Sequence, residues 1–368
     1  MVTIRYLFAF VVLIHALIHL MGFAKAFQLA RIENISSSIS KPAGVAWLIT
    51  TVLFMVALTG FYLDKPFWPV VALIASVASQ IIIVTVWKDA RWGTLANAMI
   101  MVVAIQAFAN VQFQKMITDE IEGLLHHVDE STVTAHQQPE TLPKPVYKWL
   151  KHSGALDNET VYCARIKQTG RMRTTPDGKW MNFTAEQYFD FQNPAFVWTT
   201  QVEMISLITL TGRDKFVNGE GEMLIKLLSL VAVADEGPHD KINSAAMLRF
   251  LGETSWFPST ALSPYITWQE MDSVSAKVTM KYKDITVQGT FFFTEEGDFS
   301  AFEAARYYGG SADSRLENWR IDVVDYKTFN GIRIPYKNRV TWKLEEGDFM
   351  WLELEITALE PNNPTRFE

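Results

Sequence analysis

Two histidines, His15 and His19, stand four residues apart in the apolar stretch LIHALIHLMGF near the N-terminus. Residues at positions i and i+4 lie on one face of a helix, where two imidazoles can share a metal ion or serve a haem. A polar side chain is costly in hydrocarbon, so an intramembrane histidine suggests either a function or a hydrogen-bonding partner on a neighbouring helix.

The other long apolar segments favour the hydrogen-bonding interpretation of this pair. Their apolar bodies contain no His, Cys, Asp or Glu, whereas cofactor sites in helix bundles usually take ligands from facing helices. They do carry amides that can bond across a bundle. The candidate intramembrane polar residues are His15, His19, Gln80, Gln106 and Asn110. Haem, proton or quinone chemistry at the histidine pair is the alternative, and we expect no other cofactor.

The second dense stretch is MLRFLGETSWFPSTAL, which begins at Met247. Arg249 and Glu253 are spaced to pair on a helix, and aromatic residues follow directly. We favour a core-packing corner held by an ion pair. The alternative is the mouth of an apolar pocket, where arginine binds an anionic head group. The candidate ligand-binding residues are then Arg249, Glu253, Trp256, Phe257, Arg171, Arg173 and Arg213.

Motifs of the common enzyme classes are absent from the sequence. GEGEML, from Gly219, lacks the third glycine of a dinucleotide-binding loop and fits a hairpin better. No P-loop, G-x-S-x-G or H-E-x-x-H motif occurs. The single cysteine, Cys163, excludes an intrachain disulfide and a cysteine-based zinc site. We predict no catalytic or metal-binding residues, and we favour a protein that is not an enzyme.

Hydropathy divides the 368-residue chain into two parts. The first third contains apolar runs long enough to cross about 30 Å of hydrocarbon, which takes about 20 helical residues. These runs are Ile4–Phe23, Ala43–Leu63, Pro66–Trp87 and Thr94–Phe113. The partner they predict is the lipid bilayer. The net charge of −7 and the lack of a Lys/Arg-rich run argue against nucleic acid, and the oligomeric state is left open.

The first apolar run also has a signal-peptide interpretation, because Ala24-Lys25-Ala26 resembles a cleavage site. A weakly basic n-region and the length of the run favour a permanent anchor. The more basic side of the short loops faces the cytoplasm, and it carries Lys25, Arg31, Lys41, Lys88 and Arg91. We therefore expect a protein of the bacterial plasma membrane with an extracytoplasmic C-terminal part.

After the fourth run, QFQKMITDEIEGLLHHV keeps a helical apolar face, and a Thr-, Gln- and Pro-rich linker follows. The sequence thus predicts a four-helix transmembrane domain over residues 1–113, an amphipathic helix and linker over 114–141, and a β-rich domain over 142–368. In the last, Lys277–Lys283 alternates between polar and apolar residues as a strand does. Turns are predicted at Asp177-Gly178, Asn218-Gly219, Glu296-Gly297, Asn330-Gly331 and Glu346-Gly347.

Two helices are expected among these strands. One covers Thr184–Phe191, where Thr184 and Gln187 have capping-box spacing, and the other covers Asn243–Gly252. The predicted fold class is a four-helix transmembrane bundle plus an α+β domain. In that domain a strongly curved antiparallel sheet, a half-open barrel, wraps a few helices. We expect an apolar cavity between this sheet and the second helix.

Five ordered blocks of the C-terminal part resemble an uncharacterised bacterial family, a domain of unknown function that often follows a membrane anchor. The blocks are LPKPVYKWLKHSG, FTAEQYFDFQNPAFVW, GRDKFVNGEGEM, LRFLGETSWFP and NGIRIPYKNRVTW. The strand-rich end is similar, more weakly, to lipoprotein-carrier domains of the bacterial envelope, which enclose an apolar cavity. That likeness implies a domain that binds a lipid, lipoprotein or other apolar ligand. A membrane redox or transport component that uses His15 and His19 is the alternative function.

Overall fold

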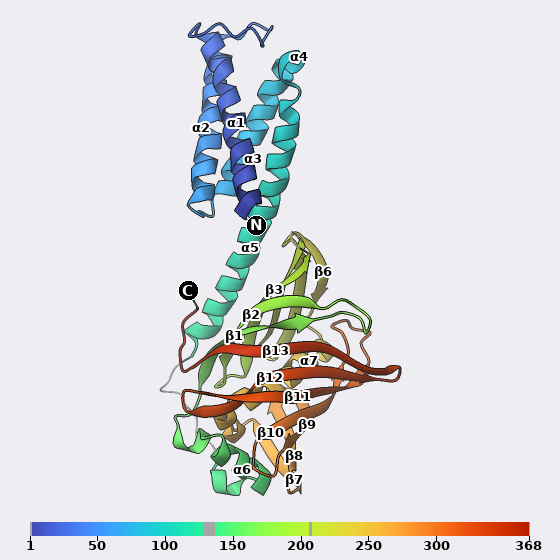
Figure 1. The fold of residues 1–368 in the computed structure, drawn as a ribbon. Coiled ribbons are helices and arrows are strands. Elements are labelled where there is room, and N and C mark those ends of the chain that lie inside the picture. Colours follow the sequence, from blue (N-terminus) through green and yellow to red (C-terminus); the bar gives the residue numbers. More distant parts are fainter. Residues whose placement is uncertain (1, 129–136, 206–207, 368) are drawn as a thin grey trace. The chain divides into compact units, whose positions relative to one another are not determined.

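A computed structural model describes residues 2–128, 137–205 and 208–367 of the protein. The chain divides into two compact units, Met1–Lys115 and Met116–Glu368. Figure 1 shows the helices and strands of both units.

The first unit is a bundle of apolar helices. Its elements are α1 (Val2–Ala26), α2 (Lys41–Tyr62), α3 (Trp68–Thr85), the short α4 (Trp87–Ala90) and α5 (Gly93–His126), which continues into the second unit. By length and composition, α1, α2, α3 and α5 could each cross a membrane. Ser40 caps α2 by accepting a hydrogen bond from the Ala43 N–H.

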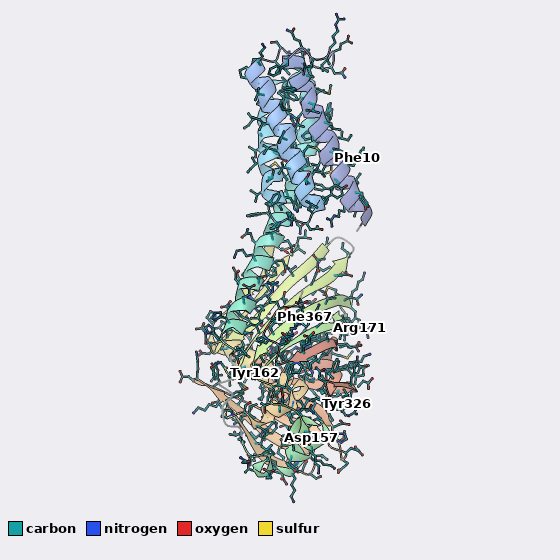
Figure 2. The ribbon with its side chains drawn as sticks, turned by 90° about the vertical axis from the view of Figure 1, so that its left-hand side faces the viewer. Phe10, Asp157, Tyr162, Arg171, Tyr326 and Phe367 are labelled. Carbon is teal, nitrogen blue, oxygen red and sulfur yellow. The ribbon has the colours of Figure 1, made fainter. Side chains whose placement is uncertain are left out.

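Small side chains lie beside large ones such as Phe54 in the interior of this bundle, and many large apolar side chains point outward. Ala16, Ala75 and Ala104 are fully buried and let the helices approach closely. Outward residues such as Phe10, which is 60% exposed and labelled in Figure 2, have no protein cover. This distribution suits helices whose outer surface is solvated by lipid rather than water.

Beyond the first unit, α5 continues through the predicted amphipathic segment without a break. The segment is helical as far as His126, and Ile117, Ile121, Leu124 and Leu125 of the expected apolar face are buried. Residues 129–136 of the predicted linker, with His136, lie outside the described residues.

The second unit is built on a 13-stranded antiparallel sheet with the order β6-β5-β4-β3-β2-β1-β13-β12-β11-β10-β9-β8-β7. The strands are β1 (Cys163–Met172), β2 (Met181–Asp190), β3 (Ala195–Ile205), β4 (Ile208–Val217), β5 (Glu220–Leu227), β6 (Val231–Glu236), β7 (Ile266–Asp272), β8 (Ser275–Tyr282), β9 (Ile285–Phe293), β10 (Phe299–Tyr307), β11 (Leu316–Phe329), β12 (Ile332–Leu344) and β13 (Gly347–Pro361). Pairing of β1 with β13 joins two meanders, one on each side.

The edge strands β6 and β7 do not pair with each other within the described residues, so the sheet stays open. The chain between them forms α7 (Asp240–Glu253) and two short 3₁₀ turns, Thr254–Trp256 and Pro258–Leu262. Helix α7 packs on β4 and β5 of one meander and on β9 and β10 of the other, and the sheet curves round it (Figure 1). The helix α6 (Lys144–His152) packs near β7 and β8, and two further 3₁₀ turns cover Pro139–Thr141 and Ala155–Asp157. The predicted half-open barrel is confirmed.

Four of the five predicted turn dipeptides lie between consecutive strands, and the fifth, Glu346-Gly347, ends on the first residue of β13. Asn218 and Gly219 have φ angles of +56° and +85°, and a type I′ hairpin turn requires positive φ at both central residues. GEGEML therefore forms the β4–β5 hairpin, as its sequence context indicated.

One helix prediction is right and the other is wrong. Helix α7 contains the predicted Asn243–Gly252 segment and buries Met247, Phe250 and Leu251 completely. The segment Thr184–Phe191, however, belongs to β2 and the turn after it. Pairing with both β1 and β3 overrides the capping-box spacing, which is a local signal.

Candidate functional site

Helix α7 places Arg249 against the inner face of the sheet. Its Nε donates to Glu253 Oε1 at 2.7 Å, and its Nη1 donates to Asp214 Oδ2 on β4 at 2.5 Å. Gln187 on β2 completes the cluster, because its Nε2 donates to Glu253 Oε2 at 2.7 Å. One arginine thus connects the helix to two strands.

Aromatic rings and burial set the electrostatics of this cluster. The guanidinium carbon of Arg249 lies 4.9 Å from the ring centres of both Phe196 and Trp198, which favours cation–π attraction. Burial raises the pKa of Glu253, although Arg249 opposes the rise. Burial lowers the pKa of Arg249, but Glu253 and Asp214 outweigh that effect and the net direction is upward. The Arg249 side chain remains 16% exposed, so solvent reaches it.

A second arginine lies on the neighbouring part of the inner face. Arg306, on β10, donates from Nε to the Ala245 carbonyl of α7 at 3.1 Å. Its guanidinium carbon is 4.8 Å from the ring centre of Trp319 and 5.6 Å from that of Trp342. Burial lowers the pKa of Arg306 to about 10. Among the residues that the structure describes, Arg306 forms no ion pair with a carboxylate.

Some apolar side chains on the same face are only half-buried. They pack against the core from one side, and they are Met172, Met181, Trp198, Leu210 and Leu352. Strand register sets Met172 opposite both Met181 and Leu352. The inner face therefore combines an accessible apolar surface with a solvent-reachable arginine.

The aromatic corner after α7 lies in the core. Trp256 is 4% exposed and Phe257 is 1% exposed. The Phe257 ring packs 5.2 Å from the Phe189 ring and 4.9 Å from the Phe191 ring, measured between centres. Access of a ligand to Trp256 and Phe257 stays a prediction.

The other three predicted arginines do not join Arg249. Arg171 donates to Glu353 at 2.6 Å on the outer face of the sheet, where Figure 2 labels it. Arg213 also points outward and contacts Glu120 of α5 at 3.1 Å. Arg173, at the end of β1, donates to the Met350 carbonyl at 2.8 Å. The pleat of the strands thus places Arg171 and Arg213 on the face of the sheet opposite to Arg249.

A pocket of about 510 Å³ lies on that outer face. Most of the residues in its lining are polar or charged by type, among them Thr169, Arg171, Asn182, Gln201, Lys337 and Glu355. Glu353, which is part of the lining, pairs with Arg171 at 2.6 Å and with Arg339 at 3.0 Å. The pocket differs in position from the cavity expected beside α7.

The sequence reasoning missed two members of the inner cluster. Gln187 was assigned to a helix, although Phe183, Ala185 and Gln187 already alternate with polar residues as a strand does. Arg306 lies within an apolar strand and belongs to no motif, and its nearness to Arg249 depends on α7 bridging two meanders. No sequence signal could have indicated that contact.

The bundle contains a separate polar network. His15 Nε2 lies 2.9 Å from Asn97 Oδ1 and 3.1 Å from Ser79 Oγ, and His19 Nε2 lies 2.8 Å from the same hydroxyl. Asn97 donates to Gln80 at 3.0 Å, and Gln80 donates to Thr94 at 3.1 Å. The predicted Gln106 and Asn110 lie further along α5.

These hydrogen bonds connect α1, α3 and α5. In the described residues, no group of three or more His, Cys, Asp or Glu side chains is arranged to hold a metal ion. Haem binding at His15 and His19 stays a prediction, and the absorption spectrum of the purified protein would test it.

Comparison with known proteins places the second unit in a family. No curated protein matches the chain. A solved DUF1329 family protein from Desulfovibrio piger is 11% identical with a TM-score of 0.35, over 60% of this chain and 94% of that one. A putative outer membrane lipoprotein-sorting protein domain from Vibrio parahaemolyticus is 9% identical with a TM-score of 0.36, over 60% and 95%. Both likenesses are weak.

The family model described as "Family of unknown function (DUF6544)" matches residues 131–354. The predicted membership of an uncharacterised family is confirmed, and the chain belongs to DUF6544.

Proposed function

We propose that this chain is a non-enzymatic membrane protein whose C-terminal domain binds a lipid, lipoprotein or other apolar ligand at the bacterial cell envelope. The observation that carries the proposal is the half-buried apolar surface inside an open sheet. Met172, Met181, Leu210 and Leu352 are neither sealed in the core nor turned to the outer face. Covering them with an acyl chain would remove apolar area from water.

The arginines beside this surface favour a ligand that carries an anionic group. Arg249 is partly exposed, and Arg306 forms no ion pair in the described chain. Arginine binds carboxylate and phosphate groups through paired hydrogen bonds. A ligand with an acyl chain and an anionic head group would match both features.

The proposed location is the plasma membrane, with the C-terminal domain on the extracytoplasmic side. The four apolar helices supply the anchor, and the Lys and Arg residues of the short loops supply the orientation. Fusion of alkaline phosphatase to the C-terminus tests this orientation, because the enzyme is active only outside the cytoplasm. An inactive fusion, with an active cytoplasmic reporter at the same position, would reverse the topology.

Photo-crosslinking tests ligand binding on a defined face of the sheet. A photoreactive residue replaces Leu352, on the inner face, or Glu353, its neighbour on the outer face. We expect a lipid adduct in the intact mass of the full-length protein labelled at 352 and none at 353. Equal labelling at both positions, or none at either together with no co-purified lipid, would remove the basis of the proposal.

A further inference from the structure

Two hairpin tips in the second unit carry large apolar side chains that are exposed in the part of the chain that the structure describes. These residues, here called the tip patch, are Met204, Ile205, Leu230, Val231 and Val233, with exposed fractions of 44%, 64%, 40%, 61% and 56%. We infer that the tip patch lies in the surface of a lipid bilayer and forms a second membrane contact besides the helices.

Strand register makes the two tips one surface. The β3–β4 hairpin brings Ile205 opposite Ile208, and Leu210 of β4 pairs with Leu227 of β5. The Leu228 N–H donates to the Thr209 carbonyl at 2.9 Å, which joins the second tip to the first.

The composition of the tips is unusual for a surface in water. No charged residue occurs from Leu227 to Val233. Strand β6 is moreover an edge of the sheet, and edges exposed to water usually carry charges or are covered. Contiguous exposed apolar residues mark a contact with a protein or a membrane.

The course of helix α5 favours a membrane over a protein as the partner of the tip patch. It is a candidate membrane span that continues into the second unit as one helix. Inside that unit, Glu120 of α5 contacts Arg213 at 3.1 Å and Lys215 at 3.0 Å, both on β4. The chain that leaves the span is therefore attached to the strand that begins at the tip patch.

The direction in which α5 runs along β4 also supports a membrane contact at the tip patch. His127, directly beyond α5, lies close enough to Asp190 to lower the pKa of that carboxyl, although burial raises the pKa overall. Asp190 pairs with Ala195, which lies at the end of β3 remote from Ile205. From Glu120 to His127 the chain thus moves away from the tips, and Met116 lies on the tip side of Glu120. The tip patch is at the end of the unit where the anchored helix enters.

This contact does not depend on ligand binding inside the sheet. Because the tips contain no Lys or Arg, we expect it to be apolar in origin, insensitive to salt, and present on zwitterionic lipid. A second copy of the chain, pairing through β6, is the competing occupant.

Single-cysteine labelling of the full chain in phosphatidylcholine nanodiscs tests the inference. The native Cys163 is fully buried, and burial raises its thiol pKa to about 12, so it does not compete for label. The variants are I205C and V231C, with T286C as the control. Thr286 is exposed on β9, near Lys283, which donates to the Asn218 carbonyl at the opposite end of β4. Each carries an environment-sensitive fluorophore.

We expect blue-shifted emission at positions 205 and 231, with quenching by lipids that carry a spin label on the acyl chain. Position 286 should show neither effect, and added salt should change nothing. Emission at all three positions equal to that of the fluorophore in water would overturn the inference. So would a blue shift without lipid quenching that appears only in discs holding two copies, since that result assigns the patch to self-association.

Discussion

Arg249 and Glu253, one turn apart on α7, form a 2.7 Å ion pair, and each of the two side chains also contacts a different strand of the sheet. Asp214 on β4 engages the arginine, and Gln187 on β2 engages the carboxylate. The pair therefore fixes the rotation of α7 inside the sheet as well as its position. Buried polar groups have this effect only when each of them has a partner.

Replacing Arg249 with methionine should destabilise the second unit strongly. The change leaves Asp214 and Glu253 near each other without a cation, and breaking a buried pair in this way costs about 3–5 kcal/mol. The control is R171M, because Arg171 is 48% exposed and surface ion pairs contribute about 0–1 kcal/mol. Urea unfolding followed by tryptophan fluorescence measures both. Equal losses would show that the Arg249 network is not a stabilising feature.

The same variant should respond to pH in a defined direction. Burial raises the pKa of Glu253 above its usual 4.5, and Arg249 holds part of that rise back. Without Arg249 the folded protein binds a proton more tightly than the unfolded chain does, so stability increases as the pH falls from 7 towards 5.

The urea midpoints of R249M at pH 7 and pH 5 measure this effect. The double variant R249M/E253Q, which cannot take up that proton, should lose the increase. An R249M midpoint that is lower at pH 5, or a double variant with the same pH response, would contradict the assignment to Glu253.

Replacing Gly22 with alanine should disrupt the helix bundle. A Cβ at this position would lie 2.1 Å from the Trp47 ring, so α1 and α2 would have to separate. The same substitution at Gly123 of α5 meets nothing within 4 Å, and there alanine should raise helix stability by about 1 kcal/mol. Thermal unfolding in nanodiscs measures both variants. A G22A protein as stable as G123A would mean that the helices do not approach as described.

Ser79 should be the most important hydroxyl of the intramembrane network. Its Oγ lies within hydrogen-bonding distance of both His15 and His19, and interhelical bonds of this kind contribute about 0.6–2 kcal/mol each. S76A is a matched control one turn away, since the buried Ser76 hydroxyl has no hydrogen-bond partner among the described residues. Unfolding in mixed micelles should show a loss for S79A and little change for S76A. A loss of the same size in both would argue against the network.

The sequence by itself determined the apolar helices, the turns and some of the strands. Those elements follow from local signals: runs of apolar residues, alternation with a period of two, and Asn-Gly pairs that adopt positive φ. His15 and His19 were likewise recognised as a pair, because their spacing alone sets them on one helix face. Membership of the family follows from ordered sequence blocks and needs no structure.

Only the tertiary structure decided which polar residues meet. Gln187 and Arg306 reach the site of Arg249 because α7 crosses the open side of the sheet, between meanders far apart in the chain. Arg171 and Arg213 are excluded because the pleat turns them to the outer face. The tip patch is also a tertiary feature: apolar residues in two hairpins look like ordinary strands until register sets them side by side at an uncovered end. Sequence patterns report the neighbours of a residue along the chain, whereas binding surfaces depend on contacts between distant segments.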